Sequence, residues 1–337
     1  MPAKARVAVL GGGAWGSVLA GLAAQHGHDV ALWEIDHTDA LALDRNRVSK
    51  RTVPGFKLPP EVAVFSGFDR IAVVANHDML VVAVPSGDVA DTMRTMAAHR
   101  VDTPPRIVVC ASKGLEPDRG LTMAEVIALN YPGARVAVLS GPSFAAEIAR
   151  GLPAALVVAS ADAAAAAEVQ SCFGGDRLRV YTSDDVTGVC VGGALKNVIA
   201  IAVGCCDGFG FGDNARAALI TRGLAEMGRL AERMGGRART LAGLAGLGDL
   251  VLTCTGDLSR NRQVGLALAR GEALDAILGR LGHIAEGVGT ARIARDLAQR
   301  LGVDMPITRE VAAVIHDGKS PRAAVSDLLA RDIGAER

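Results

Sequence analysis

The first half of the chain alternates continuous apolar runs with longer segments of mixed polarity. Continuous runs, rather than strictly alternating ones, are typical of strands that helices cover on both faces. The segments Gly87–His99 and Thr122–Asn130 fit the helices expected between such strands. The pattern therefore predicts a doubly wound α/β sheet. Its predicted strands are Arg6–Leu10, Asp29–Glu34, Met79–Val84, Arg106–Cys110, Val136–Leu139, Ala155–Ala159 and Leu178–Tyr181.

After Asp185 the strand pattern stops, and helical segments follow one another with glycine-rich joints. We therefore predict an α/β domain over residues 1–185 and an all-α domain over residues 186–337. The length of 337 residues agrees with two domains, because single hydrophobic cores stop growing at about 250–300 residues. The predicted helices are Val186–Cys206, Ala215–Met234, Arg260–Arg270, Ala273–Leu281, Gly289–Leu301 and Thr308–His316.

The composition limits the classes of partner. Half of the residues are hydrophobic and only 3% are aromatic, so aliphatic side chains must build both cores. Lys and Arg number 36, as do Asp and Glu, and the net charge is zero. This balance argues against general attraction to nucleic acid or to anionic membranes, which needs a basic field or patch. A small anionic ligand stays possible, because it needs only a local pocket.

The sequence carries no clear targeting or redox signal. Met1–Arg6 leads almost directly into an apolar strand, so no secretory signal is predicted. Apolar runs are broken by glycine or charge before about 18 residues, so no membrane span is predicted. The cysteines lack metal-binding or Cys-x-x-Cys spacing, and we interpret them as buried side chains in a reducing cytoplasm, with no metal site. They are Cys110, Cys172, Cys190, Cys205, Cys206 and Cys254.

A glycine-rich loop follows the first predicted strand. Residues 11–16 read Gly-Gly-Gly-Ala-Trp-Gly, which satisfies the spacing Gly-x-Gly-x-x-Gly. Gly11 permits a tight turn, Gly13 lets the backbone approach a pyrophosphate, and Gly16 lets the next helix pack closely. The N–H groups that begin this helix would face the phosphates. Between a strand and a helix, the motif predicts a Rossmann-like dinucleotide site.

The end of the second strand bears on the choice between NAD and NADP. Glu34 lies about 20 positions beyond the loop, where an acidic side chain accepts the ribose hydroxyls of NAD. Four basic residues farther along would suit the 2′-phosphate of NADP if they folded back onto the ribose. We favour a solvated surface for them, and therefore NAD(H), but NADP(H) stays open at this point. The four are Arg45, Arg47, Lys50 and Arg51.

Polar residues follow two further strands of the predicted sheet. The segment Ala111–Glu116, which contains Lys113, comes directly after Arg106–Cys110, and the segment Ser140–Ala145, Ser-Gly-Pro-Ser-Phe-Ala, follows Val136–Leu139. Ligands of open α/β sheets bind beyond the carboxyl ends of the strands. Both segments are therefore candidates for contact with substrate or cofactor.

Lys196 and Asn197 interrupt the most apolar of the predicted helices. A lysine in such surroundings is costly unless it is paired or used. The alternative is a lysine that extends to the surface at one edge of the helix. Gly192 and Gly193, one turn earlier, would let another element approach closely, so we favour a functional lysine.

A further polar region runs from Asp249 to the start of the helix predicted at Arg260. Ser259 is a suitable N-cap for that helix. Arg260 and Arg262 then lie in the first turn, where each cation opposes the helix dipole by about 0.3–1 kcal/mol. A bound phosphate, held by N–H groups, Asn261 and a guanidinium, would remove the conflict. Alternatively, the two arginines are exposed and a nearby aspartate balances them.

These segments together resemble the bacterial-type NAD(P)-dependent glycerol-3-phosphate dehydrogenases. The resemblance runs in order along nearly the whole chain, and the segments Lys196-Asn197 and Ser259-Arg260-Asn261 are specific to that family. It implies a homodimeric cytoplasmic oxidoreductase that interconverts dihydroxyacetone phosphate and sn-glycerol 3-phosphate for phospholipid synthesis. The other matching segments are Ser112–Gly114, Ser140–Phe144, Asn214–Leu219, Gly246–Asp249, Glu286-Gly287 and Met305–Ile307.

The resemblance also implies residue roles. Lys196 would be the general acid/base at the C2 oxygen, and Lys113 and Asp249 complete the implied catalytic group. The implied substrate contacts are Lys113, Gly141, Ser143, Lys196, Asp249, Ser259, Arg260 and Asn261. The implied cofactor contacts are Gly11, Gly13, Ala14, Trp15, Gly16, Glu34, Lys113, Ala145, Arg260, Ile284 and Glu286.

Two departures from the family and two alternative functions stay open. Ala14 lacks the loop hydroxyl that the family often has, and Glu34-Ile35-Asp36 stands where a basic residue or His is common, which puts NADP use in doubt. The chain could be a related two-domain hydroxy-acid dehydrogenase, which would not need a phosphate site at Ser259–Asn261. It could also bind a dinucleotide without catalysis, although the two lysines and Asp249 argue against this.

Overall fold

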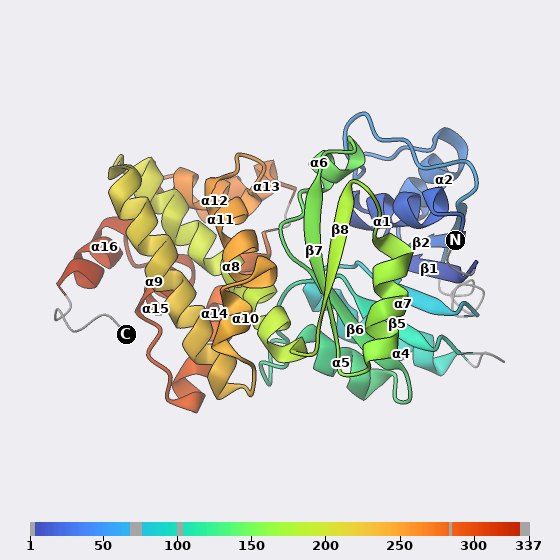
Figure 1. The fold of residues 1–337 in the computed structure, drawn as a ribbon. Coiled ribbons are helices and arrows are strands. Elements are labelled where there is room, and N and C mark those ends of the chain that lie inside the picture. Colours follow the sequence, from blue (N-terminus) through green and yellow to red (C-terminus); the bar gives the residue numbers. More distant parts are fainter. Residues whose placement is uncertain (1–3, 68–75, 100–103, 283–284, 331–337) are drawn as a thin grey trace. The chain divides into compact units, whose positions relative to one another are not determined.

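The computed structural model describes residues 4–67, 76–99, 104–282 and 285–330 (Figure 1). The described chain divides into two compact units. The first combines the chain up to Lys113 with Leu121–Cys190, and the second combines Gly114–Gly120 with the chain from Val191 onward. The first contains the sheet and the second is built from helices, which confirms the predicted fold class. The predicted domain boundary at residue 185 stays a prediction.

The sheet has eight strands in the order β3-β2-β1-β4-β5-β6-β7-β8. Neighbouring strands are parallel except for β6 and β7, which are antiparallel. The helix between them, α6 (Ala145–Ala149), has five residues and spans only about 7.5 Å, too little to carry the chain back for a parallel crossover. The strands are β1 (Arg6–Leu10), β2 (Asp29–Glu34), β3 (Ala63–Ser66), β4 (Met79–Val82), β5 (Ile107–Cys110), β6 (Arg135–Ser140), β7 (Ala154–Ser160) and β8 (Leu178–Ser183).

Helices cover both faces of this sheet, as the continuous apolar runs predict. On β1, Val7 and Val9 belong to one core cluster, while Ala8 and Leu10 are equally buried outside it. That cluster includes residues of α1 and α7, and α5 contacts β5 and β6 and packs beside α4. The helices of this unit are α1 (Ala14–Gln25), α2 (His37–Asn46), η2 (Ser86–Asp88), α4 (Val89–Ala98), α5 (Met123–Asn130), α6 and α7 (Ala163–Phe173).

The second unit packs its helices around a core of aliphatic side chains. The six predicted helices are present with shifted ends, and α10, η3, α11 and α16 were not predicted. The helices are α8 (Val186–Gly208), α9 (Gly212–Arg233), α10 (Ala238–Leu241), η3 (Leu244–Gly248), α11 (Asp249–Thr255), α12 (Arg260–Ala269), α13 (Leu274–Arg280), α14 (Glu286–Leu301), α15 (Pro306–His316) and α16 (Pro321–Leu329).

One described helix, α8, is long and apolar enough to cross a membrane. Gly192, Gly193 and Lys196 interrupt its apolar run, as the sequence shows, but the mean hydropathy of 1.9 remains that of a possible span. However, 94% of its most apolar window is buried inside the protein. Such burial is typical of the core helix of a globular unit, which explains the length of the run.

Glu226 of α9 holds the start of α15. Its buried carboxylate accepts the N–H of Ile307 at 2.6 Å, the N–H of Thr308 at 3.0 Å and the Thr308 hydroxyl at 2.9 Å. The helix has no side-chain cap of its own and begins at Pro306. Burial raises the pKa of Glu226 to about 7, and the hydrogen bonds from Ile307 and Thr308 oppose this shift. A carboxylate from another helix therefore satisfies donors that helix ends otherwise leave unpaired.

The segment Gly114–Gly120 packs with the second unit, although the strand before it belongs to the sheet. Leu115 is 3% exposed and lies in the core of the second unit. The carbonyl oxygen of Arg119 accepts a hydrogen bond from the Arg300 guanidinium at 2.7 Å. The second unit is therefore assembled from two separate stretches of chain.

All six cysteines are free and buried. Burial raises the pKa of the thiols, including those of Cys110 and Cys172. A buried thiol with a raised pKa is unreactive. The interpretation of these residues as apolar core side chains is therefore confirmed.

Candidate active site

The turn from β1 into α1 leaves open space at one glycine and none at two others. Gly11 has φ +105°, and a Cβ added to it would lie 2.7 Å from the carbonyl oxygen of Ala83. A Cβ on Gly16 would lie 1.9 Å from the carbonyl oxygen of Gly11, whereas one on Gly13 would meet nothing within 4 Å. The start of α1 has no side-chain cap. Backbone donors beside open space fit the pyrophosphate of a dinucleotide. The other predicted loop contacts, Ala14 and Trp15, begin α1 and pack against the core.

Glu34 ends β2 and is bound to this loop. Its Oε2 atom accepts the N–H of Gly12 at 2.9 Å, and Oε1 accepts the N–H of Asp36 at 3.0 Å. Arg51 lies with its Nη1 atom 3.6 Å from Oε1. The structure therefore places Glu34 at the phosphate loop, while its contact with the ribose stays a prediction, and it folds one of the four basic residues back onto the end of β2.

Lys113, Gly141 and Ser143 meet beyond the carboxyl ends of β5 and β6. Lys113 Nζ donates to the carbonyl oxygen of Gly141 at 3.2 Å and to Ser143 Oγ at 3.4 Å. The Ser143 hydroxyl donates to the same carbonyl at 2.8 Å. Gly141 has φ +121°, a conformation that favours glycine. Ala145 follows as the first residue of α6. The structure thus brings these predicted site residues together, while their roles stay predictions.

Gly192 lets α8 and η3 approach each other at backbone distance. A Cβ on Gly192 would lie 2.4 Å from the carbonyl oxygen of Ala245 in η3. The η3 segment is a single π-helical turn, a feature frequent at functional sites. Asp249 begins α11 directly after it, and Lys196 lies one turn beyond Gly192 on α8. The close approach expected from the glycine pair is therefore real at Gly192, and it brings Asp249 toward Lys196.

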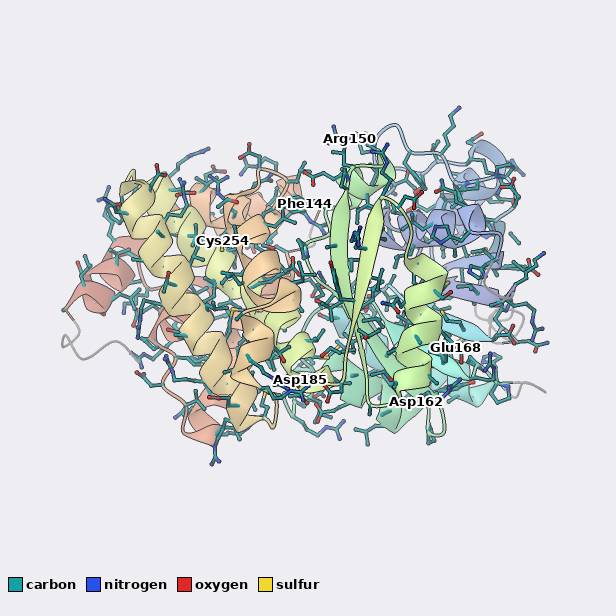
Figure 2. All side chains as sticks on the ribbon, viewed as in Figure 1. Phe144, Arg150, Asp162, Glu168, Asp185 and Cys254 are labelled. Carbon is teal, nitrogen blue, oxygen red and sulfur yellow. The ribbon has the colours of Figure 1, made fainter. Side chains whose placement is uncertain are left out.

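Lys196 and Asp249 form a buried ion pair. Lys196 Nζ lies 2.5 Å from Asp249 Oδ1, with side-chain exposures of 10% and 1%. Because a buried charge needs a partner, the pair explains why α8 tolerates a lysine. The Thr253 hydroxyl donates to the Asp249 carbonyl oxygen at 2.6 Å. Burial raises the pKa of the Cys254 thiol in α11 (Figure 2) to about 12, and the charge of Lys196 opposes this shift.

Asn261 links α8, α12 and α14 through its side-chain amide. Its Nδ2 atom donates to Asn197 Oδ1 at 2.9 Å, and its Oδ1 atom accepts the N–H of Gly287 at 3.0 Å. A Cβ on Gly287 would lie 2.6 Å from the Asn197 carbonyl oxygen. Asn197 was singled out in the sequence as the neighbour of Lys196 but was not among the predicted contacts. Its polar side chain within an apolar helix is the signal that points to it.

Arg262 has its counter-charges within the protein. The Ser259 hydroxyl accepts the N–H of Arg262 at 3.2 Å, which confirms Ser259 as the N-cap of α12. The Arg262 guanidinium lies 2.8 Å from Asp207 Oδ2 and 3.0 Å from Asp257 Oδ1. The expectation that both first-turn arginines call for an external anion was therefore wrong for Arg262, because Asp207 and Asp257 balance its charge.

Arg260, the first residue of α12, remains exposed. Atoms around its guanidinium exclude part of the hydration and lower its pKa, and the carboxylate of Glu286 opposes that shift. Glu286 is the first residue of α14. Two of the predicted cofactor contacts are therefore electrostatically coupled. A third, Ile284, lies outside the described residues.

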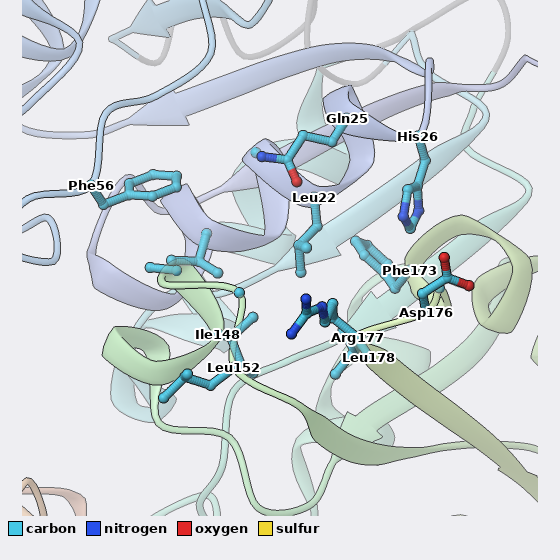
Figure 3. A pocket seen from close by; sticks show the side chains of 15 residues that line it. Leu22, Gln25, His26, Phe56, Ile148, Leu152, Phe173, Asp176, Arg177 and Leu178 are labelled. Carbon is cyan, nitrogen blue, oxygen red and sulfur yellow. The ribbon is translucent and has the colours of Figure 1, made fainter.

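A pocket of about 240 Å³ lies on the first unit (Figure 3). Its walls include Leu22, Phe56, Ile148, Phe173 and Leu178. It adjoins the C-terminal half of α1, whereas the glycine loop lies at the N-terminal end of that helix. None of the predicted site residues that the structure describes lines it, so this pocket is not the candidate active site.

A Rossmann-like sheet with an open phosphate loop, accompanied by a helical unit that holds a buried lysine–carboxylate pair, defines the class of dinucleotide-dependent oxidoreductases. Comparison with known proteins narrows the class. Residues 6–166 match the model of the NAD-dependent glycerol-3-phosphate dehydrogenase N-terminus, and residues 185–326 match the model of its C-terminus. The chain therefore belongs to the NAD-dependent glycerol-3-phosphate dehydrogenase family.

Individual relatives agree with the family match along the whole chain. Glycerol-3-phosphate dehydrogenase (NAD(P)+) of Thiobacillus denitrificans is 50% identical over 332 residues, covering 98% of this chain and 99% of that protein. The enzyme of the same name from Thioalkalivibrio sulfidiphilus is 49% identical, covering 97% of each chain. The crystal structure of glycerol-3-phosphate dehydrogenase from Coxiella burnetii is 37% identical with a TM-score of 0.92, covering 98% of this chain and all of that chain.

Proposed function

We propose that this chain catalyses the reversible NAD(P)-dependent reduction of dihydroxyacetone phosphate to sn-glycerol 3-phosphate. The buried Lys196–Asp249 pair is the observation that carries the proposal, because it provides a fixed proton donor in the helical unit. Membership of the family and the activity in the name of the relative from Thiobacillus denitrificans support the same reaction. We further propose that the product supplies glycerophospholipid synthesis.

Lys196 is the proposed general acid/base. When bound, the nicotinamide cofactor supplies the hydride for the C2 carbon of the substrate. Negative charge then develops on the C2 oxygen, and the Lys196 ammonium gives its proton to that oxygen. In the reverse direction, the Lys196 amine takes the proton from the C2 hydroxyl. The opposite charge of Asp249 stabilises the ammonium form and fixes the position of Nζ.

The substrate phosphate is proposed to bind at the start of α12. Because Asp207 and Asp257 hold Arg262, the guanidinium that we assign to the phosphate is that of Arg260. Asn261 donates one N–H to Asn197, and its second N–H is the donor that we assign to the ligand, together with Ser259. Charge-assisted contacts of this kind orient the substrate rather than take part in the proton transfer.

In the first unit, Lys113, Gly141 and Ser143 are the proposed substrate contacts, and Lys113 and Ala145 the proposed cofactor contacts. The carbonyl oxygen of Gly141 and the hydroxyl of Ser143 direct Lys113 Nζ. A lysine held in this way offers a positive charge beyond the strand ends, where a phosphate or a developing oxyanion is stabilised. We count Lys113 with Lys196 and Asp249 in the catalytic group.

NAD(H) is the proposed preferred cofactor, with NADP(H) as the second. Glu34 is fixed beside the phosphate loop and lies near Asp36 and Asp39. Carboxylates at the end of β2 accept ribose hydroxyls and repel a 2′-phosphate. Arg51, which pairs with these carboxylates, is the feature that favours NADP(H).

We propose a homodimer in the cytoplasm as the working form of the protein. The buried, free thiols support a reducing compartment. The family resemblance supports the dimer, which a determination of mass in solution would test.

Initial rates of NADH and NADPH oxidation with dihydroxyacetone phosphate test the proposed reaction. We expect turnover that falls by about 10²–10⁴-fold in Lys196→Ala, while fluorescence titration shows retained NADH binding. Arg94→Ala, a change at a 64% exposed side chain of α4, is the matched control and should leave the rate unchanged.

Two outcomes would contradict parts of this proposal. No turnover with either cofactor would exclude dihydroxyacetone phosphate as the substrate and favour the related hydroxy-acid dehydrogenases. Undiminished turnover in Lys196→Ala would retain the reaction but assign the proton donor elsewhere, with Lys113 the next candidate.

A further inference from the structure

Arg51 lies among three carboxylates at the end of β2. Its Nε atom is 3.0 Å from Asp39 Oδ2, its Nη1 atom is 3.6 Å from Glu34 Oε1, and its Nη2 atom is 3.8 Å from Asp36 Oδ2. The Arg51 side chain is 45% exposed, whereas those of Glu34 and Asp39 are 3% and 5% exposed. Arg51 follows α2 in the chain, so the loop after that helix brings a cation back to β2.

The guanidinium is held by charge rather than by aligned hydrogen bonds. Among the described residues, no aligned hydrogen bond reaches Asp39 Oδ2, and the distances to Glu34 and Asp36 exceed normal hydrogen-bond lengths. A long, half-exposed side chain held in this way reorients readily toward a stronger partner. A phosphate is such a partner, because the guanidinium fork binds two of its oxygens at once.

The neighbouring basic residue Arg47 is committed to the fold. Its Nη1 atom donates to the carbonyl oxygen of Val62 at 2.8 Å. Its own φ of +62° closes the C-terminus of α2. Of the four basic residues at positions 45, 47, 50 and 51, all of which the structure describes, Arg51 is therefore the one whose ion pairs connect it to Glu34, the carboxylate bound to the phosphate loop.

We propose that Arg51 is the residue that binds the 2′-phosphate of NADP(H) in this chain, and that Asp39 limits the binding of NADP(H) by holding the Arg51 guanidinium. The inference rests on the proposed function, since it assigns cofactor selectivity to the same site. Acidic residues at the end of the second strand receive the adenosine ribose hydroxyls. A cation that contacts Glu34 is therefore beside the 2′ position.

Selectivity between NAD(H) and NADP(H) then depends on whether Arg51 binds the three carboxylates or a 2′-phosphate. When Arg51 turns to a 2′-phosphate, the buried carboxylates of Glu34 and Asp39 lose its charge, which is unfavourable. When the 2′ position carries a hydroxyl, Arg51 keeps its three partners. The cluster therefore favours NAD(H) and still admits NADP(H), and a weaker hold by Asp39 should shift the balance toward NADP(H).

Calorimetric titration with adenosine 2′,5′-bisphosphate and with 5′-AMP tests the inference without turnover. In Arg51→Gln we expect the affinity for the bisphosphate to fall by about tenfold or more, the usual effect of losing a hydrogen bond to a charged group. The affinity for 5′-AMP should change by less than about threefold, because that ligand lacks the 2′-phosphate. Arg94→Gln on α4 is the matched loss of one exposed arginine and should change neither affinity.

Asp39→Asn provides the opposite test and keeps the backbone N–H that Asp36 caps. It should raise the affinity for the bisphosphate and the NADPH:NADH ratio of kcat/KM. If Arg51 had only a structural role, neither value should rise. Equal losses for both nucleotides in Arg51→Gln, an unchanged bisphosphate affinity in Asp39→Asn, or binding of neither nucleotide would overturn the inference. Normal NADH turnover with any of these results leaves the proposed reaction intact, whereas selective nucleotide binding without turnover contradicts the reaction alone.

Discussion

Lys196 Nζ and Asp249 Oδ1 lie 2.5 Å apart in the second unit. The absence of a side chain at Gly192 makes this pairing possible. Gly192, one turn before Lys196, lets α8 touch the backbone of Ala245, four residues before Asp249. The ion pair and the helix contact are therefore parts of one arrangement. Changes at either should alter both stability and turnover.

Lys196→Met should remove turnover and destabilise the fold by about 3–5 kcal/mol, because it leaves the Asp249 carboxylate buried without its partner. The double variant Lys196→Met/Asp249→Asn should recover part of the stability without recovering turnover. Urea unfolding and initial rates measure the two effects separately. A double variant less stable than Lys196→Met would show that the pair does not act as a charge pair.

Gly192→Ala should destabilise the protein by about 1–3 kcal/mol and lower kcat, because its Cβ would meet the Ala245 carbonyl oxygen. Gly279→Ala in α13 is the matched control, since a Cβ there meets nothing within 4 Å. The control should stabilise the protein slightly, as alanine favours helices over glycine. Thermal unfolding of both variants decides whether the close approach matters; equal Tm shifts would argue that it does not.

Gly13→Ala and Gly16→Ala should separate binding from folding. A Cβ at Gly13 has open space, so this variant should keep its Tm but bind NADH at least about tenfold more weakly, as a methyl group blocks the pyrophosphate. A Cβ at Gly16 would lie 1.9 Å from the Gly11 carbonyl oxygen, so that variant should lose stability. Fluorescence titration measures the affinity for NADH, and thermal unfolding measures the Tm. Unimpaired NADH binding by Gly13→Ala would show that this loop does not contact the cofactor.

Glu226 should make stability depend on pH. Its pKa is about 7 in the folded chain, against 4.5 as the reference value, so the native state binds this proton more tightly than the unfolded state does. The resulting stabilisation is complete below pH 4.5 and is lost as the pH rises through 7. At 1.36 kcal/mol per pKa unit the loss is at most about 3 kcal/mol.

Urea unfolding of the unaltered protein and of Glu226→Gln at pH 5 and pH 8 measures this contribution. The difference in unfolding free energy between the two pH values should change in the variant, because glutamine does not titrate. At pH 8, where Glu226 is ionised, glutamine should also lower stability, since its amide meets the N–H groups of Ile307 and Thr308 with one acceptor oxygen instead of the two of the carboxylate. Identical pH dependence in both proteins would assign the titration to other groups.

Local patterns were sufficient to predict the sheet and most of its strands. β1 and β2 begin and end at the predicted residues, because each is a continuous apolar run next to glycine or charge. β3 was missed because it is a short edge strand with no fully buried residue. The antiparallel direction of β7 was not predicted, since it depends on the length of α6 and not on any property of the strand itself.

The site was predictable where a polar residue stands out in apolar surroundings, as Lys196 does. Its partner Asp249 came from the family resemblance, because the helices around it begin in glycine-rich sequence that lacks a helical pattern. The pairing of Arg262 with Asp207 was not predictable, since the two residues are 55 positions apart and meet only through helix packing. Arg51 belongs to the same category, because its ion pairs depend on the path of a loop.

The discontinuity of the second unit has a consequence for how the protein folds as it is synthesised. Leu115 emerges from the ribosome with the strands of the sheet, before α8 exists. Its place is in a core that includes residues as late as Ile315, so it stays without its partners until nearly the whole polypeptide has been made. A fragment beginning at residue 186 would lack this leucine, and a gap of that size costs about 2–5 kcal/mol. The helical half is therefore expected to reach full stability only when the rest of the chain accompanies it.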